Sequence, residues 1–265
     1  MRNTIKAVSP QNFAGKTWRR FSDYLFATKT HMVPVVVNEL AQAATCIPLG
    51  FVKLDASFQL MAIMALQPNT NALVGLDGQW LARYVPAAIR SGPFNLVKPQ
   101  DADGMVLCFD EGSGLLREDG QGEAFFNDEG KPAPAVQDVI TFLSQVERSR
   151  MLTQSAVEAL DSAGLIKPWT LSVVQQDKTI PVQGLYQVDE AALEALDDAA
   201  YLLLRSKKAL PLAHAQLLSM NLMPWLWQMT QARADSARAK PRLPRETSPE
   251  LASFALLEDD GVLKF

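Results

Sequence analysis

Residues suited to chemistry are few in this chain. Only two histidines occur among the 265 residues, His31 and His214, and they are far apart in sequence. An iron site with two histidines and one carboxylate would need both of them to meet in the fold. His214 lies in the apolar stretch LPLAHAQLLSM, which is typical of a core or interface histidine, whereas His31 lies in the polar run TKTHM and should be solvated. We therefore predict no metal site, and His31 and His214 are the candidates if one exists.

The other catalytic patterns also fail on spacing. Ser113 has glycines directly beside it in DEGSG, but the nucleophile turn of hydrolases needs glycines two residues away on each side. No glycine-rich phosphate loop occurs, and the acidic turns lack the alternating ligands and distal glutamate of a calcium loop. Cys46 and Cys108 lie in apolar settings, which predicts buried, reduced thiols. We predict no catalytic residues and no cofactor.

An aromatic and basic group is the best candidate for ligand or partner binding. Trp and Tyr offer a large contact area with a polar end, and Arg pairs with carboxylates through two donors. Trp80 and Tyr84 could instead anchor a helix start on the sheet, with Arg83 paired to an internal acid. Both interpretations stay open for the candidate residues, which are Trp80, Arg83, Tyr84, Arg90, Phe94 and Trp227.

The composition limits the function classes. The chain has 29 acidic and 25 basic residues and a net charge of −4, which argues against binding to the nucleic-acid backbone. No apolar run reaches the ~18 residues that would span a bilayer, and the N-terminus has no secretory signal. We expect a cytoplasmic protein without a membrane span, and leaderless export to the cell surface is the alternative.

The pattern of apolar residues predicts an α+β fold with antiparallel-dominated sheets, packed helices and an extended C-terminal arm. The predicted segments are an N-terminal segment at 1–25, a domain at 26–232, and a linker with a docking tail at 233–265. Within the domain, residues 26–109 are rich in strand patterns, 110–130 form an acidic surface excursion, and 131–232 contain helices and a hairpin.

Individual elements follow from local signals. Strands are expected at 33–37, 50–54, 94–98 and 105–109, and hairpins between 58–66 and 72–76 and between 169–175 and 179–188. Helices are expected at 38–45, 85–90, from 136 to about 150, at 155–163, after Asp189, and at 209–232. Gly164 should stop one helix, Pro224 should kink or restart the last, and FFNDEGKP should form a hairpin tip.

Several stretches together resemble the SapC family of bacterial proteins. They are VPVVVNELAQAATCIPLGF, LMAIMALQPNTNALVGLDGQWLARYVPAAIRSGPFNL, VLCFDEGSG, FFNDEGKPAPAVQDVITFL and AHAQLLSMNL, in this order between about residues 26 and 229. The signature is an LxGL strand, an acidic glycine turn, a Trp, a Tyr-x-Pro and a Pro-Phe. Gln216 stands where the resemblance leads us to expect a histidine.

The resemblance implies a role without assigning a reaction, because the family has no agreed catalytic residues. Its name implies a structural role at the cell surface, in a surface layer. Many members are encoded beside outer-membrane receptors, halogenase-like proteins and cupin-like oxygenases, which implies a partner in peptide or protein modification.

We therefore expect a non-enzymatic interaction or structural protein that binds another protein, with no nucleic-acid ligand and with homo-oligomers forming through the C-terminal tail. The alternative is a subunit or partner of a peptide- or protein-modifying oxidoreductase, with a ligand pocket of its own.

Overall fold

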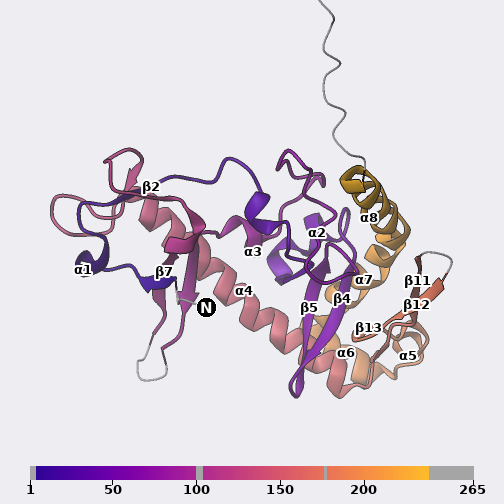
Figure 1. Cartoon of the computed structure of the whole chain (residues 1–265). Helices are drawn as coiled ribbons and strands as arrows, with labels where there is room; N and C mark the ends of the chain where they lie inside the picture. The colour runs from indigo at the N-terminus through magenta and orange to yellow at the C-terminus, as the bar shows by residue number, and fades with distance from the viewer. Residues whose placement is uncertain (1–3, 100–103, 176–177, 239–265) are drawn as a thin grey trace, which may run out of the picture.

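The computed structural model describes residues 4–99, 104–175 and 178–238, and they form an α+β fold (Figure 1). Every strand pair within these ranges is antiparallel. The strands form four sheets, and the 29-residue helix α4 (Pro134–Ser162) runs from one group of sheets to the other. The predicted fold class is confirmed in its helices and antiparallel sheets. Of the predicted C-terminal arm, residues 239–265 lie outside the described residues.

The largest sheet has five strands in the order β10-β13-β4-β5-β3. Their bounds are Ile166–Pro168 for β10, Leu185–Val188 for β13, Leu49–Leu54 for β4, Ser57–Ile63 for β5 and Met32–Pro34 for β3. β4 and β5 form its central hairpin, in which Leu49 lies opposite Ala62. The predicted strand at 50–54 is confirmed, whereas the β-branched run at 33–37 is a strand only at its start.

The hairpin predicted between residues 58–66 and 72–76 is wrong. β5 has β4 on one edge and β3 on the other, so neither edge is left for a third strand. Residues 72–76 form turns instead, and Val74 makes one isolated bridge. The side chain of Asn71 is fully buried, and its Nδ2 donates to the carbonyl oxygen of Ala27 at 3.0 Å. Asn71, which lies between the two strands predicted for this hairpin, therefore fixes the segment inside the protein.

The helices other than α4 are shorter. The α-helices are α1 (Pro10–Phe13), α2 (Leu40–Ala43), α3 (Ala87–Arg90), α5 (Glu190–Glu194), α6 (Asp198–Ser206), α7 (Ala209–Ser219) and α8 (Met223–Arg238). The 3-10 helices are η1 (Leu25–Ala27), η2 (Val37–Glu39), η3 (Glu111–Ser113) and η4 (Met220–Leu222). No helix in the described ranges is both long enough and apolar enough to cross a membrane.

α4 is one continuous helix, whereas the sequence predicts a helix that ends near Arg150 and a second one at 155–163. The stretch between them contains no Gly or Pro that would stop the helix. The predicted stop at Gly164 is confirmed, with φ of 68° there and a bond of 3.0 Å from the Leu165 N–H to the Leu160 carbonyl. Because the helix is continuous, its two halves pack into two different cores.

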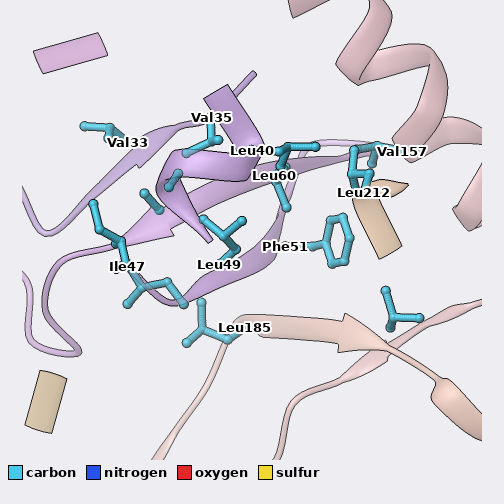
Figure 2. Packing of buried hydrophobic residues seen from close by; sticks show 14 of the residues in the cluster. Val33, Val35, Leu40, Ile47, Leu49, Phe51, Leu60, Val157, Leu185 and Leu212 are labelled. Carbon is cyan, nitrogen blue, oxygen red and sulfur yellow. The ribbon is translucent and has the colours of Figure 1, made fainter. Parts of the chain in front are cut away.

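The main core lies between the five-stranded sheet and the helices. Figure 2 shows Leu49, Phe51 and Leu60 of the sheet beside Val157 of α4 and Leu212 of α7. All five side chains are buried. This apolar contact fixes the C-terminal half of α4 against the sheet.

The N-terminal half of α4 packs on a second core made largely of aromatic rings. One sheet around it has the order β1-β7-β6, with β1 at Ile5–Ala7, β7 at Val106–Asp110 and β6 at Phe94–Val97. The other has the order β8-β2-β9, with β8 at Leu116–Arg117, β2 at Thr17–Trp18 and β9 at Glu123–Ala124. Ring contacts with centroid separations from 4.6 to 6.2 Å connect Phe13, Trp18, Phe94, Phe109 and Phe125.

One prediction about the segment 110–130 is wrong, because part of the segment lies in this core. Phe125 lies in the segment 110–130, predicted as a surface excursion, but its side chain is fully buried. The acidic residues Glu118 and Asp119 are exposed, as expected for that segment. The hairpin tip is also confirmed, since Phe126 bridges to Pro132. The division of the chain into segments stays a prediction.

In the C-terminal third, the predicted helix cap and helix break are confirmed, but the chain forms more helices and strands than were predicted. Asp189 caps α5, and a second cap at Asp197, whose Oδ1 accepts from the Ala200 N–H at 2.8 Å, starts α6. The predicted helix at 209–232 consists of α7, η4 and α8, and Pro224 stands in the first turn of α8, as expected. The hairpin of β11 (Leu171–Gln175) and β12 (Lys178–Val182) is confirmed, and β13 joins the large sheet.

Gln216 connects α7 to two strands of the large sheet. Its side chain is fully buried, with Oε1 accepting from the Val188 N–H at 3.0 Å and Nε2 donating to the Leu49 carbonyl at 3.1 Å. The residue that stands in place of the expected histidine thus satisfies two backbone groups inside the core.

Candidate binding groove

A buried carboxylate lies where η2 meets α3. Glu39 is only 4% exposed, and its two oxygens accept three hydrogen bonds. Oε1 accepts from the Val36 N–H at 3.1 Å, and Oε2 accepts from the Tyr84 hydroxyl and the Ala87 N–H, each at 2.7 Å. Charge-assisted bonds of this kind compensate for the cost of burying the carboxylate. Glu39 therefore fixes the start of α3 next to η2.

Two hydroxyls of α4 hold η2 from the other side. Thr153 Oγ1 accepts from the Val37 N–H at 2.9 Å, and Ser149 Oγ accepts from the Asn38 N–H at 3.1 Å. Both hydroxyl side chains are buried. Polar residues in the middle of a helix are thus used to position a short helix from a distant part of the sequence.

Arg90 continues this network to the surface. Its Nη2 donates to the Tyr84 hydroxyl at 2.9 Å, and its Nε donates to the Val85 carbonyl at 2.9 Å. Its guanidinium carbon lies 5.3 Å from the centroid of the Tyr84 ring and 5.2 Å from that of the Phe142 ring. Burial, followed by the hydrogen bond to Glu39, raises the pKa of Tyr84 from 10.0 to about 12, so this hydroxyl stays protonated at neutral pH.

A segment that we call the strap, residues 18–26, crosses the surface beside α3. The Tyr24 N–H donates to the Gly78 carbonyl at 2.8 Å, and Phe21 packs on Phe26 with a centroid separation of 5.1 Å. Gly78 has φ of 82°, and a Cβ there would lie 2.9 Å from Cβ of Asp23. Only glycine therefore suits both this backbone conformation and the close approach of the strap.

Three hollows adjoin along the strap, α3 and α4. The central hollow, of about 410 Å³, is lined by Trp18, Phe21, Arg90, Phe94, Asp138 and Phe142 among others. The η2 hollow, of about 350 Å³, shares Arg90 and Phe142 with it and also includes Asn38, Gln42, Tyr84 and Gln145. The strap hollow, of about 570 Å³, shares Phe21 and Gly92 with the central one and includes Leu25 and Phe26. We call the three together the aromatic groove.

The sequence candidates divide between this groove and other places. Tyr84, Arg90 and Phe94 line it, with Phe94 fully buried against Trp18. Trp80 and Arg83 line none of the three hollows. Nε1 of Trp80 donates to the Tyr84 carbonyl at 2.8 Å, and Arg83 is exposed.

Trp227 lies at another site. It lines a separate hollow of about 460 Å³ between α8 and β11, together with Trp169 and Met220. Its neighbour Trp225 packs against the main core, so the two tryptophans of MPWLWQM have different surroundings.

The histidines do not form a ligand set within the described residues. His214 is exposed on α7, because α7 turns Ala213 and Gln216 inward, so of the predicted core or interface position the core alternative is wrong. His31 is half-buried, and its backbone carbonyl accepts from the Met64 N–H at 2.8 Å. In the described ranges, no group of three or more His, Cys, Asp or Glu side chains could hold a metal.

Cys46 and Cys108 are free and buried, as predicted. Burial raises the pKa of each thiol, which disfavours the reactive thiolate.

Glu39 and the aromatic residues Trp18, Phe26 and Phe142 were not predicted from the sequence as site residues. Glu39 carries a usable signal, since it stands three residues after Val36 at a helix start, where a carboxylate can reach back to the free N–H. The three aromatic residues carry no such signal, because their place beside α3 depends on how distant segments of the chain meet.

A family model described as SapC matches residues 8–226, a range that includes every residue of the groove named above. The chain belongs to the SapC family. The resemblance in the sequence is thereby confirmed, and the LxGL and glycine-turn signature of this SapC protein builds the turn on which the strap rests. A search of the curated proteins and a search of the solved structures gave no match.

Proposed function

We propose that this SapC protein is a non-enzymatic interaction protein that binds a segment of another protein in the aromatic groove. The observation that carries the proposal is the apolar edge of the groove. Leu25 and Phe26 of the strap are 50% and 49% exposed, beside a hollow that they help to line. Large apolar side chains exposed around a depression are typical of interaction sites.

The shape of the groove favours an extended segment of a partner. Its hollows share lining residues, so they form one elongated surface from η2 to the strap. Aromatic residues and an arginine, the types that carry most binding energy at protein interfaces, stand along it. A compact ligand would occupy one hollow only, whereas an extended segment would contact all three.

The acid–base groups of Glu39 and Tyr84 beside the groove are already engaged, which supports a binding role over a catalytic one. Glu39 uses both carboxylate oxygens on three donors. The Tyr84 hydroxyl donates to Glu39 and accepts from Arg90. A catalytic role for this pair would break bonds that hold α3 in place.

Photo-cross-linking in the native host tests this proposal. p-Benzoylphenylalanine replaces Phe26 in one variant and Tyr201 of α6 in another. Tyr201 is a matched control, because it is 44% exposed and lines none of the three hollows. We expect the Phe26 position to give a specific cross-linked protein that the Tyr201 position does not give. Mass spectrometry then decides whether the partner is a surface-layer protein, an outer-membrane receptor or a modifying oxidoreductase.

Binding of the purified partner completes the test. Phe26→Ser should weaken binding at least about tenfold, because truncating an aromatic anchor of an interface costs about 2 kcal/mol or more. Tyr201→Ser should leave binding unchanged. Equal cross-links at both positions, or a partner that binds the Phe26→Ser variant as tightly as the wild type, would refute the proposal.

A further inference from the structure

Arg90 is an exposed cation that the fold holds in one place. Its Nε and one Nη2 donor are bound to the Val85 carbonyl and the Tyr84 hydroxyl, and its plane lies near the rings of Tyr84 and Phe142. An arginine side chain loses rotamer entropy when it is fixed, and these contacts already fix Arg90 before any ligand binds. The remaining donors of Arg90 are therefore preorganised for an acceptor.

Arg90 makes no direct ion pair within the described part of the chain: its two hydrogen bonds go to uncharged groups, and it is connected to the carboxylate of Glu39 only through the Tyr84 hydroxyl. Arg20, the other arginine of the central hollow, differs. Its Nε lies 2.7 Å from Oε1 of Glu123, and Asp138 also favours its charge. Asp138, an exposed acid, is the carboxylate that lines the central hollow. Arg90 is thus the cation of the groove that can accept a new anion.

The surroundings of Arg90 define what would flank such an anion. On one side, the central hollow presents apolar walls, including Trp18, Phe94 and Val139. On the other side, the η2 hollow presents the exposed amides of Gln42 and Gln145. Arg90 lines both hollows, so a chain that crosses from one to the other passes its guanidinium.

We infer that Arg90 binds an acidic side chain of the partner segment, with an apolar residue on its central-hollow side and a polar residue on its η2 side. This inference rests on the proposed function and adds the chemistry of the bound segment. The planar guanidinium can give two parallel N–H bonds to one carboxylate, which a lysine could not. The apolar walls on one side of Arg90 lower the local polarity and so strengthen that interaction.

Two matched peptide pools test the inference. Both contain fluorescein-labelled, amidated nine-residue peptides with Leu, Phe, Ser and Gln at the outer positions, and the central residue is Glu in one pool and Gln in the other. Fluorescence anisotropy gives the affinity of each pool for the full chain. We expect the Glu pool to bind at least about tenfold more tightly, since a charged hydrogen bond in a partly buried site is worth about that factor.

Variants of the protein assign the preference to one residue. Arg90→Gln should bring the two pools to equal affinity. Arg83→Gln is the matched control, because it removes the same charge from an exposed arginine that lines none of the hollows, and it should keep the preference. Circular dichroism checks that both variants are folded, and the comparison of the pools on the wild type needs no variant at all.

Other outcomes overturn the inference in distinguishable ways. Failure of both pools to bind, equal binding of the two pools, or a Glu preference that survives Arg90→Gln would each refute it. Binding of 4-phenylbutyrate that depends on Arg90, without binding of either pool, would point to a small acid instead of a peptide. If the cross-linked partner requires Phe26 but has no dependence on Arg90, the proposed function stands and this inference fails.

Discussion

The carboxylate of Glu39 gives the sharpest prediction for stability. Each of its oxygens has a different set of donors: the Val36 N–H on Oε1, and the Tyr84 hydroxyl with the Ala87 N–H on Oε2. Both backbone donors belong to buried residues. A buried donor without a partner costs about 1–3 kcal/mol. Glu39→Ala leaves both N–H groups and the hydroxyl without an acceptor, so we expect the free energy of unfolding to fall by about 4 kcal/mol.

Glu39→Gln should lower the free energy of unfolding by about 2 kcal/mol, because one donor loses its acceptor. The amide has a single acceptor oxygen, and the favourable orientation places it at the Oε2 position, where it keeps two donors. The amide nitrogen then faces the Val36 N–H, and that bond is lost. The opposite orientation would lose two bonds instead of one. The order of stability should therefore be Glu, then Gln, then Ala.

Urea denaturation measures these differences, with the slope m checked for constancy across the variants. Glu194→Gln is the control, because Glu194 is exposed on α5, and its effect should stay within about 0.5 kcal/mol. Two results would refute the reasoning. One is a decrease in the free energy of unfolding below about 1 kcal/mol for Glu39→Ala. The other is an equal decrease for Glu39→Gln and Glu39→Ala. Either result would mean that the donors around Glu39 find other partners.

Three further predictions concern single groups. Gln216→Ala should destabilise the protein by about 3 kcal/mol in urea unfolding, because it leaves two buried backbone groups of β4 and β13 unpaired. The folded state raises the pKa of Tyr84 from 10.0 to about 12, so the stabilising contribution of its hydroxyl is fully present below about pH 10 and is lost as the pH rises toward 12. The stability difference between the wild type and Tyr84→Phe should shrink across that window, and a constant difference would contradict the assigned bonds. Cys46 and Cys108 should react with a thiol-specific disulfide reagent at least about tenfold more slowly in the native protein than in denaturant, since burial raises both pKa values; equal rates would contradict their burial.

Local signals in the sequence predicted ends and caps of elements well. Asp189 caps a helix, Gly164 ends one, and Pro224 starts one, as their types predict. Each of these effects acts through bonds or dihedral angles within a few residues, so the neighbouring sequence contains the needed information.

Predictions that required a choice of partner were less successful. The hairpin at 58–66 and 72–76 fails because β5 pairs with β3 and β4, and the apolar pattern alone cannot say which edge is taken. Phe125 stands among exposed acids in the sequence, yet it packs against Phe13, Phe94 and Phe109. Its neighbours in space come from other parts of the chain.

For the candidate site, too, local signals were sufficient for some residues, and others depended on contacts between distant segments. Tyr84, Arg90 and Phe94 stand close together in one stretch, so the sequence identified them as a group, and the structure places all three on the groove. Phe26 and Phe142 were missed, because their position beside that stretch depends on the paths of the strap and α4.

The sequence by itself determined the α+β class with antiparallel sheets and the caps of individual helices, since periodicity and local bonding fix these, and its resemblance to known stretches identified the SapC family. Only the tertiary structure decided that Glu39, Tyr84 and Arg90 form one network and that strap, α3 and α4 enclose a groove. The physical reason is that burial and hydrogen bonding depend on which surfaces meet, and those contacts join residues far apart along the chain.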